Sequence, residues 1–215
     1  MGYKSLKNCI SDLKKRQYIK VISDEVDPKL EMASIHLDEF SDNKKVLLFN
    51  NIKDCRFSAV SNLFGTLERS KYMFRDSINL VKDLIAIKIN PIVALKNPFK
   101  TFMVAINGIY ALPKKVKFKN FYEIKIEDLP QIKCWKNDGG AFVTLPQVYS
   151  EDIDNPGVLN SNLGMYRIQL SGNDYLKNQE VGLHYQLHRG IGIHQKKATD
   201  KGVPLKVSIF VGGPP

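Results

Sequence analysis

Apolar residues in the N-terminal part of the chain recur first at helical and then at strand-like spacing. Ser5 precedes apolar residues at 6, 9, 10 and 13, so an N-capped amphipathic helix is expected to end near Gln17. The wholly apolar run 46–49 is typical of a buried strand. The other expected elements are strands at 18–22 and 57–60, a helix opened by Pro28, and one or two helices within 67–89 that stop before Pro91.

The C-terminal part shows short β-type runs instead. They cover 142–145, 147–149, 165–170, 181–187 and 205–211, with turn-forming sequences such as 155–157 and 171–174 between them. Such a pattern is typical of a β-barrel or β-sandwich. Residues 96–122, which contain Pro98 and Pro113, are the best candidate for a boundary, so we expect one unit over 1–115 and a second over 116–215. The expected fold class is α+β.

Charge adds a basic segment to this picture. The net charge is +10, and seven lysines without an acidic residue lie between Leu84 and Tyr122. We interpret the segment as a solvated basic face, and peripheral association with an anionic membrane surface is the alternative. A nucleic-acid partner is not expected, because Phe118 and Phe121 are too few for a base-stacking surface.

Cysteine usage and the apolar runs bear on the cellular compartment. Cys9, Cys55 and Cys134 lie far apart and form no CxxC pair, which favours a reducing cytoplasm. The N-terminus lacks the apolar core of a signal peptide, and the longest apolar run, 102–112, is far shorter than the roughly 20 residues of a membrane span. We expect a soluble cytoplasmic protein.

The histidines are the first candidates for chemistry. His184, His188 and His194 fall close together, but the HxxxH pair lacks the glutamate of a zinc protease, because Tyr185 follows the first histidine. Glycines in this segment disfavour a helix, and in a strand His184, Gln186 and His188 would share one face. Spacing alone therefore favours an ordinary polar sheet face and leaves a metal site as the alternative.

Several separated motifs, in order, resemble the UbiD-type decarboxylases. The C-terminal ones are NLGMYRIQ from Asn162, GLHYQLHRG from Gly182 and GVPLKVSIFVGG from Gly202. The upstream ones are NLFGT from Asn62, DLP from Asp128, KCW from Lys133 and FVTLP from Phe142. The resemblance covers nearly the whole chain, and it is specific because the motifs match together.

This resemblance implies an N-terminal α+β domain followed by the first part of a split β-barrel, similar to flavin reductases, that binds prenylated FMN. It also implies a divalent metal, Mn(II) or Mg(II), with K+ as a further cation. Asn162 and His188 match two of the metal ligands that tie the cofactor phosphate to the protein. A hard cation is suited to such ligands.

The resemblance assigns the cofactor contacts as well. The matching positions are Thr144, Met165, Tyr166, Arg167, His184, Tyr185, Gln186, Arg189 and Gly190. Arg167 is the expected catalytic residue, because a guanidinium can hold a carboxylate with two parallel hydrogen bonds.

The implied activity is a carboxy-lyase that removes CO2 from an aromatic or α,β-unsaturated acid, such as a polyprenyl 4-hydroxybenzoate. The implied partners are that acid, a flavin prenyltransferase that supplies the cofactor, and further copies of the full-length enzyme. Family members are more than twice this long, and their metal-binding glutamate, their acidic proton donor and their C-terminal domain follow the point that matches Pro215.

The run 205–211 leads directly into Gly212-Gly213-Pro214-Pro215, so a truncated chain is expected, with a terminal strand paired inside a sheet as the alternative. A non-catalytic subunit that binds flavin or phosphate is the second functional hypothesis.

Overall fold

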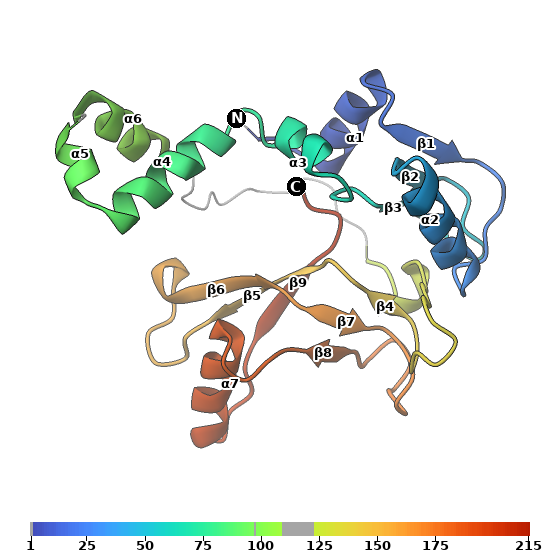
Figure 1. Cartoon of the computed structure of the whole chain (residues 1–215). Helices are drawn as coiled ribbons and strands as arrows, with labels where there is room; N and C mark the ends of the chain where they lie inside the picture. The colour runs from blue at the N-terminus through green and yellow to red at the C-terminus, as the bar shows by residue number, and fades with distance from the viewer. Residues whose placement is uncertain (1, 97, 109–122) are drawn as a thin grey trace.

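The computed structural model describes residues 2–96, 98–108 and 123–215. The elements of the N-terminal unit are helices α1 (Leu6–Lys15), α2 (Glu31–Asp42) and α3 (Leu67–Met73) and strands β1 (Ile19–Ile22), β2 (Val46–Phe49) and β3 (Ala59–Ser61) (Figure 1). The sheet has the order β1-β2-β3, with β1 parallel and β3 antiparallel to β2. This unit confirms the expected mixture of helices and strands.

Local sequence signals account for the start of this unit. The Ser5 side chain accepts a hydrogen bond from the Asn8 N–H at 3.1 Å, which caps α1 as expected. Cys9 and Leu13 on one face of α1 are fully buried in a cluster with Val46 of β2 and Met73 of α3. The central strand is therefore covered by the amphipathic face of α1.

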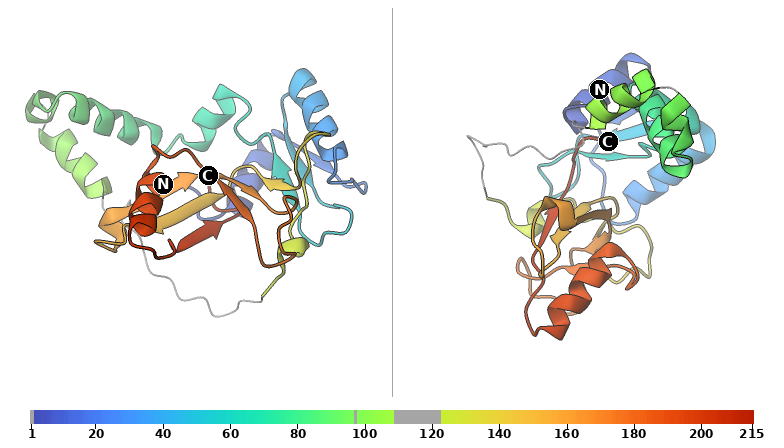
Figure 2. Two further views of the ribbon diagram at one scale, coloured as in Figure 1. Left: turned by 90° about the horizontal axis from the view of Figure 1, so that it is seen from below. Right: turned by 90° about the vertical axis from the view of Figure 1, so that its left-hand side faces the viewer.

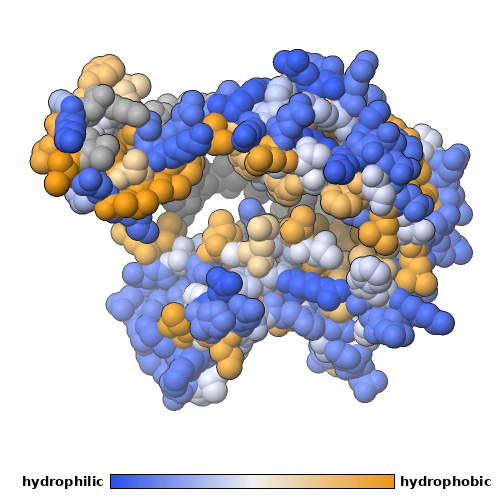
Figure 3. All heavy atoms as spheres, in the orientation of Figure 1, coloured by the Kyte–Doolittle hydropathy of each residue, from blue (hydrophilic) through white to orange (hydrophobic). Residues whose placement is uncertain are grey.

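Helices α4 (Ile78–Ile89), α5 (Ile92–Lys96) and α6 (Pro98–Gly108) form an arm that extends away from the first sheet (Figures 1 and 2). Large apolar side chains gather on the arm, and several, such as Ile89, Leu95 and Phe99, are exposed (Figure 3). Of the helices that the structure describes, none is both long enough and apolar enough to span a bilayer.

The C-terminal unit contains two three-stranded antiparallel sheets. Its elements are strands β4 (Phe142–Val143), β5 (Gln147–Glu151), β6 (Ser161–Met165), β7 (Arg167–Gln169), β8 (Gly182–His184) and β9 (Val207–Phe210), helix α7 (Gly190–Asp200), and the 3-10 turns η2 (Ile126–Asp128) and η3 (Val158–Asn160). The sheet orders are β4-β7-β8 and β6-β5-β9. Only Tyr166 separates β6 from β7, so one stretch of chain passes from one sheet into the other.

The two units are joined through the start of α2. The Leu30 N–H donates to the Lys133 carbonyl at 2.8 Å, and the Lys133 N–H donates to the Pro28 carbonyl at 3.0 Å. Ile132 packs on the apolar cluster around Phe49 of the first sheet. These bonds pair Lys29 with Lys133 in an isolated bridge, and Leu30 has a positive φ of 70°, so α2 begins at Glu31 and not at Pro28 as the sequence predicted.

Helix α7 is the largest departure from the sequence-based expectation. The sequence predicts one strand over 181–187, and Gly182, Gly190 and Gly192 disfavour a helix in the segment that holds the histidines. In the structure β8 ends at His184, Gln186 and His188 lie in a turn, and α7 begins at Gly190. The expected sheet face that joined His184, Gln186 and His188 is therefore wrong.

The remaining expectations have mixed outcomes. The run 205–211 forms β9, which pairs with β5 at a sheet edge and leaves Val207, Ile209 and Phe210 exposed. The predicted boundary at 115/116 lies outside the described residues, as do the lysines at 114, 115, 117 and 119.

Candidate functional site

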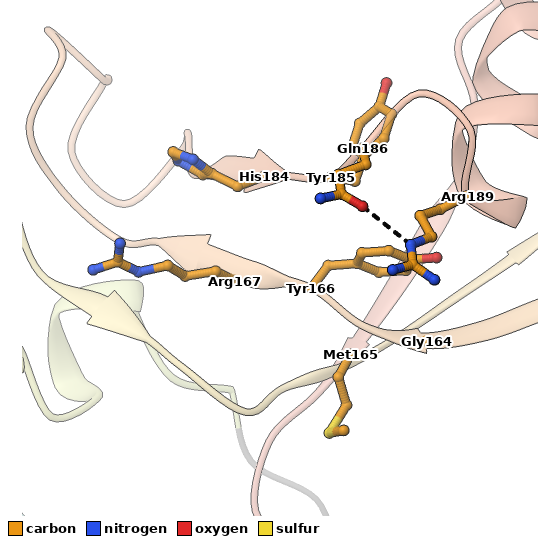
Figure 4. Close-up of a pocket in the computed structure, with 8 residues that line it drawn as sticks. All are labelled: Gly164, Met165, Tyr166, Arg167, His184, Tyr185, Gln186 and Arg189. Atoms are coloured by element: carbon orange, nitrogen blue, oxygen red, sulfur yellow. Dashed lines mark hydrogen bonds between the residues drawn. The ribbon is translucent and has the colours of Figure 1, made fainter.

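A cleft of about 480 Å³ lies where β6 continues into β7 and where β7 pairs with β8 (Figure 4). Its walls consist of aromatic, basic and amide side chains from these strands and from the turn before α7. The lining residues are Gly164, Met165, Tyr166, Arg167, His184, Tyr185, Gln186 and Arg189. Seven of these eight are positions that the sequence motifs had singled out, and Gly164 is the addition.

Tyr166 explains the glycine of the NLGMYR motif. A Cβ atom at Gly164 would lie 2.7 Å from the Tyr166 ring, so only glycine leaves room for the ring beside β6. The Tyr166 hydroxyl accepts a hydrogen bond from Asn162 Nδ2 at 3.2 Å, and its ring meets Tyr185 edge-on with 6.5 Å between centroids. The motif thus fixes an aromatic wall of the cleft and orients Asn162.

Arg167 and His184 are directly opposite each other in the β7–β8 ladder and therefore share one face of the sheet. The Arg167 guanidinium lies over the Phe142 ring at 3.5 Å from the centroid, and its Nη2 is 3.4 Å from Asp138 Oδ1. Its side chain is still 41% exposed. The guanidinium of the predicted catalytic arginine is therefore held by an ion pair and by an aromatic ring, and the residue lines the cleft.

His184 is oriented by a buried glutamine. Gln169 donates from Nε2 to the Ser171 carbonyl at 3.0 Å, which turns its Oε1 toward His184 Nε2 at 3.1 Å. Because an amide oxygen only accepts, the hydrogen of this contact is on His184 Nε2. In a neutral imidazole, Nδ1 is then the ring nitrogen that can accept a hydrogen bond from a ligand.

The N-terminus of α7 lies against Asn162. A Cβ atom at Gly190 would be 2.3 Å from Asn162 Oδ1, and one at Gly192 would be 2.2 Å from the Leu187 carbonyl oxygen. The two glycines, which disfavour a helix in the sequence, leave room for these neighbours: Gly190 for the Asn162 side chain and Gly192 for the Leu187 carbonyl. Arg189 precedes the helix, and its Nε donates to Gln186 Oε1 at 3.2 Å across the edge of the cleft (Figure 4).

The remaining predicted site residues lie around the cleft or apart from it. Gly190 and Asn162 contact each other beside it, whereas Thr144 is exposed after β4 and does not line it. His188, the second predicted metal ligand, is exposed in the turn before α7. Within the described residues, no group of three or more His, Cys, Asp or Glu side chains is arranged to hold a metal ion.

The sequence did not point to Asp138, Phe142 or Gln169 as neighbours of the site. Phe142 begins the FVTLP motif and Gln169 ends the NLGMYRIQ motif, but neither was assigned to the site. Asp138 lies in the loop before β4, and only the fold brings it to Arg167. His194, which was grouped with the other histidines, is buried away from the cleft, where its Nδ1 lies 3.0 Å from Ser150 Oγ.

Solved structures with the same arrangement of elements are UbiD-class enzymes. Vanillic acid decarboxylase of Sedimentibacter hydroxybenzoicus in its closed form matches with a TM-score of 0.76 at 20% identity, over 99% of this chain and 44% of that one. An evolved dimeric form of HmfF from Pelotomaculum thermopropionicum, in complex with prenylated FMN, matches with a TM-score of 0.71 at 19% identity, over 99% of this chain and 45% of that one.

Curated relatives are similar in sequence. One subunit of a 4-hydroxybenzoate decarboxylase from Chlamydia pneumoniae is 34% identical over 197 residues, which are 88% of this chain and 32% of the relative. An uncharacterized protein of Chlamydia caviae is 33% identical over 221 residues, which are 100% of this chain and 36% of the relative. The chain thus spans about a third of the length of these relatives.

Two family models match consecutive parts of the chain. The N-terminal domain of 3-octaprenyl-4-hydroxybenzoate carboxy-lyase matches residues 10–88, and the Rift-related domain of the same enzyme matches residues 111–215. Together with the sequence relatives and the shared fold, these matches show that the chain belongs to the UbiD family.

Proposed function

We propose that this chain is the prenylated-FMN-binding part of a carboxy-lyase that removes CO2 from an aromatic or α,β-unsaturated acid. The observation that carries the proposal is the composition of the cleft. One family motif lies in β6 and β7, a second lies in β8 and the turn after it, and both contribute side chains to the same cleft of about 480 Å³. Residues far apart in the sequence meet there.

The cleft suits a flavin in size and in chemistry. Its volume lies within the range of about 300–1,000 Å³ that is typical of ligand pockets. Tyr166 and Tyr185 offer apolar ring surface, and the side chains of His184, Gln186 and Arg189 offer polar groups for a ring system rich in carbonyls and nitrogens. In this proposal the two sheets β4-β7-β8 and β6-β5-β9 are the first part of a split barrel that supports the flavin.

The phosphate end of the cofactor would lie at the N-terminus of α7. The first backbone N–H groups of a helix can donate to an anion, and Arg189 adds a positive charge there. Asn162 Oδ1, which lies against Gly190, is a suitable ligand for Mn(II) or Mg(II), and His188 would need to turn inward to join it. Two protein ligands are fewer than such a cation requires, so phosphate, water and a carboxylate from outside this chain would complete the site.

Arg167 would hold the carboxylate that the reaction removes. Its charge is fixed, and its planar donors can grip a carboxylate with two hydrogen bonds while Phe142 supports the guanidinium from below. The electrons that CO2 leaves behind are taken up by prenylated FMN when it is bound. His184, whose Nε2 is bound to Gln169, lines the cleft and has Nδ1 left for a hydrogen bond with a ligand beside Arg167.

The substrate class follows from the relatives and stays a proposal. A polyprenyl 4-hydroxybenzoate fits the description of the matching family, and a simpler hydroxybenzoate fits the name of the relative from Chlamydia pneumoniae. The acidic proton donor, further cations such as K+, and the contacts of a homo-oligomer would come from outside these residues. A flavin prenyltransferase would supply the cofactor.

Co-expression of the chain with a flavin prenyltransferase tests the proposal. We expect the purified chain to carry prenylated FMN, detected by absorbance and mass spectrometry, and a variant with Tyr166→Ala and Arg189→Ala to carry much less. Lys196→Ala, on the exposed side of α7, is the matched control. A folded wild-type chain without flavin would overturn the proposal.

Turnover separates the enzyme from the second hypothesis, a flavin-binding subunit without activity. Release of CO2 from 4-hydroxybenzoate by the loaded chain supports a decarboxylase. Bound flavin with no CO2 release, even after addition of the rest of the enzyme, supports the non-catalytic alternative.

A further inference from the structure

The loop before β4 brings a carboxylate to Arg167. Asp138 Oδ1 lies 3.4 Å from Arg167 Nη2, and the Asp138 side chain is only 14% exposed whereas that of Arg167 is 41% exposed. Among the described residues, this is the only carboxylate within ion-pair distance of the guanidinium. The family motifs had pointed to Arg167 but not to its partner.

Asp138 is fixed by its own turn. Its Oδ2 accepts a hydrogen bond from the Trp135 N–H at 3.1 Å, and its backbone N–H donates to the Trp135 carbonyl at 3.0 Å. These bonds hold the Asp138 carboxylate in place, so the Arg167 side chain has to adopt the rotamer that reaches it. Phe142, which is 5% exposed, restricts the guanidinium of Arg167 further, because the guanidinium lies over its ring.

We propose that Asp138 is a positioning residue that holds the Arg167 guanidinium beside Phe142, so that its remaining N–H groups are presented to the carboxylate of a bound acid. The inference rests on the proposed function and assigns it a further residue. Arg167 has five N–H donors, and one of them is used for Asp138. A half-exposed arginine without this contact would sample solvent-directed rotamers and would have to be ordered again for each substrate.

The alternative is that the pair only stabilises the fold. A single ion pair with this exposure and this length adds little stability. The two explanations therefore differ in what a conservative variant does. Asp138→Asn retains an oxygen that can accept from the Trp135 N–H, but it replaces the charge that attracts Arg167. Positioning predicts a binding defect in a chain of normal stability, whereas a structural role predicts the reverse.

Titration with benzoate, on the chain as purified with flavin, tests positioning. We expect Asp138→Asn to weaken benzoate binding roughly five- to tenfold, which corresponds to losing part of one charge-assisted hydrogen-bonded contact. Benzamide, which has the same ring without the charge, should bind the variant and the wild type equally. Arg167→Lys should lose the same preference for benzoate over benzamide. Equal benzoate affinity in wild type and Asp138→Asn would overturn the inference.

Cys134 provides a second readout that needs no flavin. Burial raises the pKa of the Cys134 thiol, the negative charge of Asp138 raises it further, and the positive charge of Arg167 lowers it. Alkylation by iodoacetamide at fixed pH, followed at the Cys134 peptide by mass spectrometry, should therefore be faster in Asp138→Asn and slower in Arg167→Gln than in the wild type.

The two readouts separate the possible failures. A wild-type chain that takes up no flavin overturns the proposed function, and the alkylation rates still show whether Asp138 and Arg167 both lie near Cys134, as their contact requires. A flavin-loaded chain in which Asp138→Asn changes the melting temperature but not the preference for benzoate supports a structural pair and overturns positioning.

Discussion

His194 Nδ1 lies 3.0 Å from Ser150 Oγ in the interface between α7 and β5, where both side chains are buried. Ser150 is paired with Asn162 in the β5–β6 ladder, and His194 follows Gly190 by one helical turn. The contact between His194 and Ser150 and the contact between Gly190 and Asn162 are therefore neighbours on one face of α7. This face sets the direction in which the N-terminus of α7 points.

The Ser150–His194 pair should contribute measurably to stability. Ser150→Ala removes this hydrogen bond and leaves Nδ1 of His194, the less deeply buried of the two residues, without its partner, and we expect a loss of about 1 kcal/mol in the free energy of unfolding. His194→Leu leaves the Ser150 hydroxyl buried without its partner, so a larger loss of about 1–3 kcal/mol is expected. Urea unfolding monitored by circular dichroism measures both.

Two controls make this prediction specific. Lys196→Ala, whose ion pair with Asp200 is on the exposed side of the same helix, should stay within about 0.5 kcal/mol of the wild type. The double variant should cost less than the sum of the two single variants, because it leaves neither the hydroxyl nor the imidazole nitrogen unpaired. Strictly additive losses would show that the two side chains do not interact.

The two glycines of α7 should respond differently to alanine. At Gly190 the added Cβ meets the end of the Asn162 side chain, which can rotate away, whereas at Gly192 it meets the backbone carbonyl of Leu187, which cannot. We expect Gly190→Ala to keep stability within about 1 kcal/mol, since alanine also favours the helix, but to weaken flavin binding by displacing Asn162. Gly192→Ala should lose about 2 kcal/mol or more through backbone strain.

Flavin titration and urea unfolding of the same two variants check this contrast. Equal stability losses at both positions would contradict it, and so would undisturbed flavin binding in Gly190→Ala.

Arg69 should be essential for the N-terminal unit. Its side chain is 2% exposed and donates to the backbone carbonyls of Leu63, Lys44 and Asn62, so one guanidinium joins the ends of two loops. Arg69→Lys keeps a positive charge but loses the planar fork, and a loss of about 2–4 kcal/mol in the free energy of unfolding is expected. Lys71→Ala on the exposed side of α3 should change it by less than about 0.5 kcal/mol. A melting temperature of Arg69→Lys equal to that of the wild type would refute this role.

The Arg69 contacts also give the NLFGT motif a physical meaning that the sequence did not supply. Asn62 has a positive φ of 58° and donates from Nδ2 to the Lys45 carbonyl at 2.7 Å. A Cβ atom at Gly65 would be 1.8 Å from Asn62 Oδ1. This motif therefore determines the shape of the loop that Arg69 binds, and none of its residues lines the cleft.

Sequence reasoning succeeded where the signal was local. The cap at Ser5 and the apolar run 46–49 are decided by neighbours in the chain, and both elements are found at the expected place. Helix α7 was missed because the low helix propensity of Gly190 and Gly192 is outweighed by the burial of Ile191, His194 and Ala198 in the fold. Likewise, the partner of Arg167 is set by how the loop before β4 lies against β7.

The site was found from sequence only through the family motifs. Spacing alone favoured a polar sheet face at His184, Gln186 and His188, but the chain turns after β8 and separates them. The motif positions Met165, Tyr166 and Arg167 do reach the cleft, because β6 continues into β7 there. Thr144 does not reach it, because β4 ends one residue earlier and the chain turns away into β5.

Tyr3 should make the stability of the chain depend on alkaline pH. Burial, followed by the hydrogen bond to Asp12 Oδ2 at 2.7 Å, raises the pKa of the Tyr3 hydroxyl to about 12, although Arg75 acts in the opposite direction. A hydroxyl whose pKa is higher in the folded chain than its ordinary value near 10 stabilises the fold fully below about pH 10. That contribution is lost as the pH rises toward about 12, because the unfolded chain then releases the proton more easily.

Urea unfolding of the wild type and of Tyr3→Phe between pH 8 and pH 12 checks this dependence. The stability of the wild type relative to Tyr3→Phe should be constant up to about pH 10 and should fall above it. Cys9, whose pKa is raised to about 11 chiefly by burial, titrates in the same window, but it is present in both proteins and largely cancels in the difference. A difference that stays constant up to pH 12 would mean that the Tyr3 hydroxyl is not buried against α1 in solution.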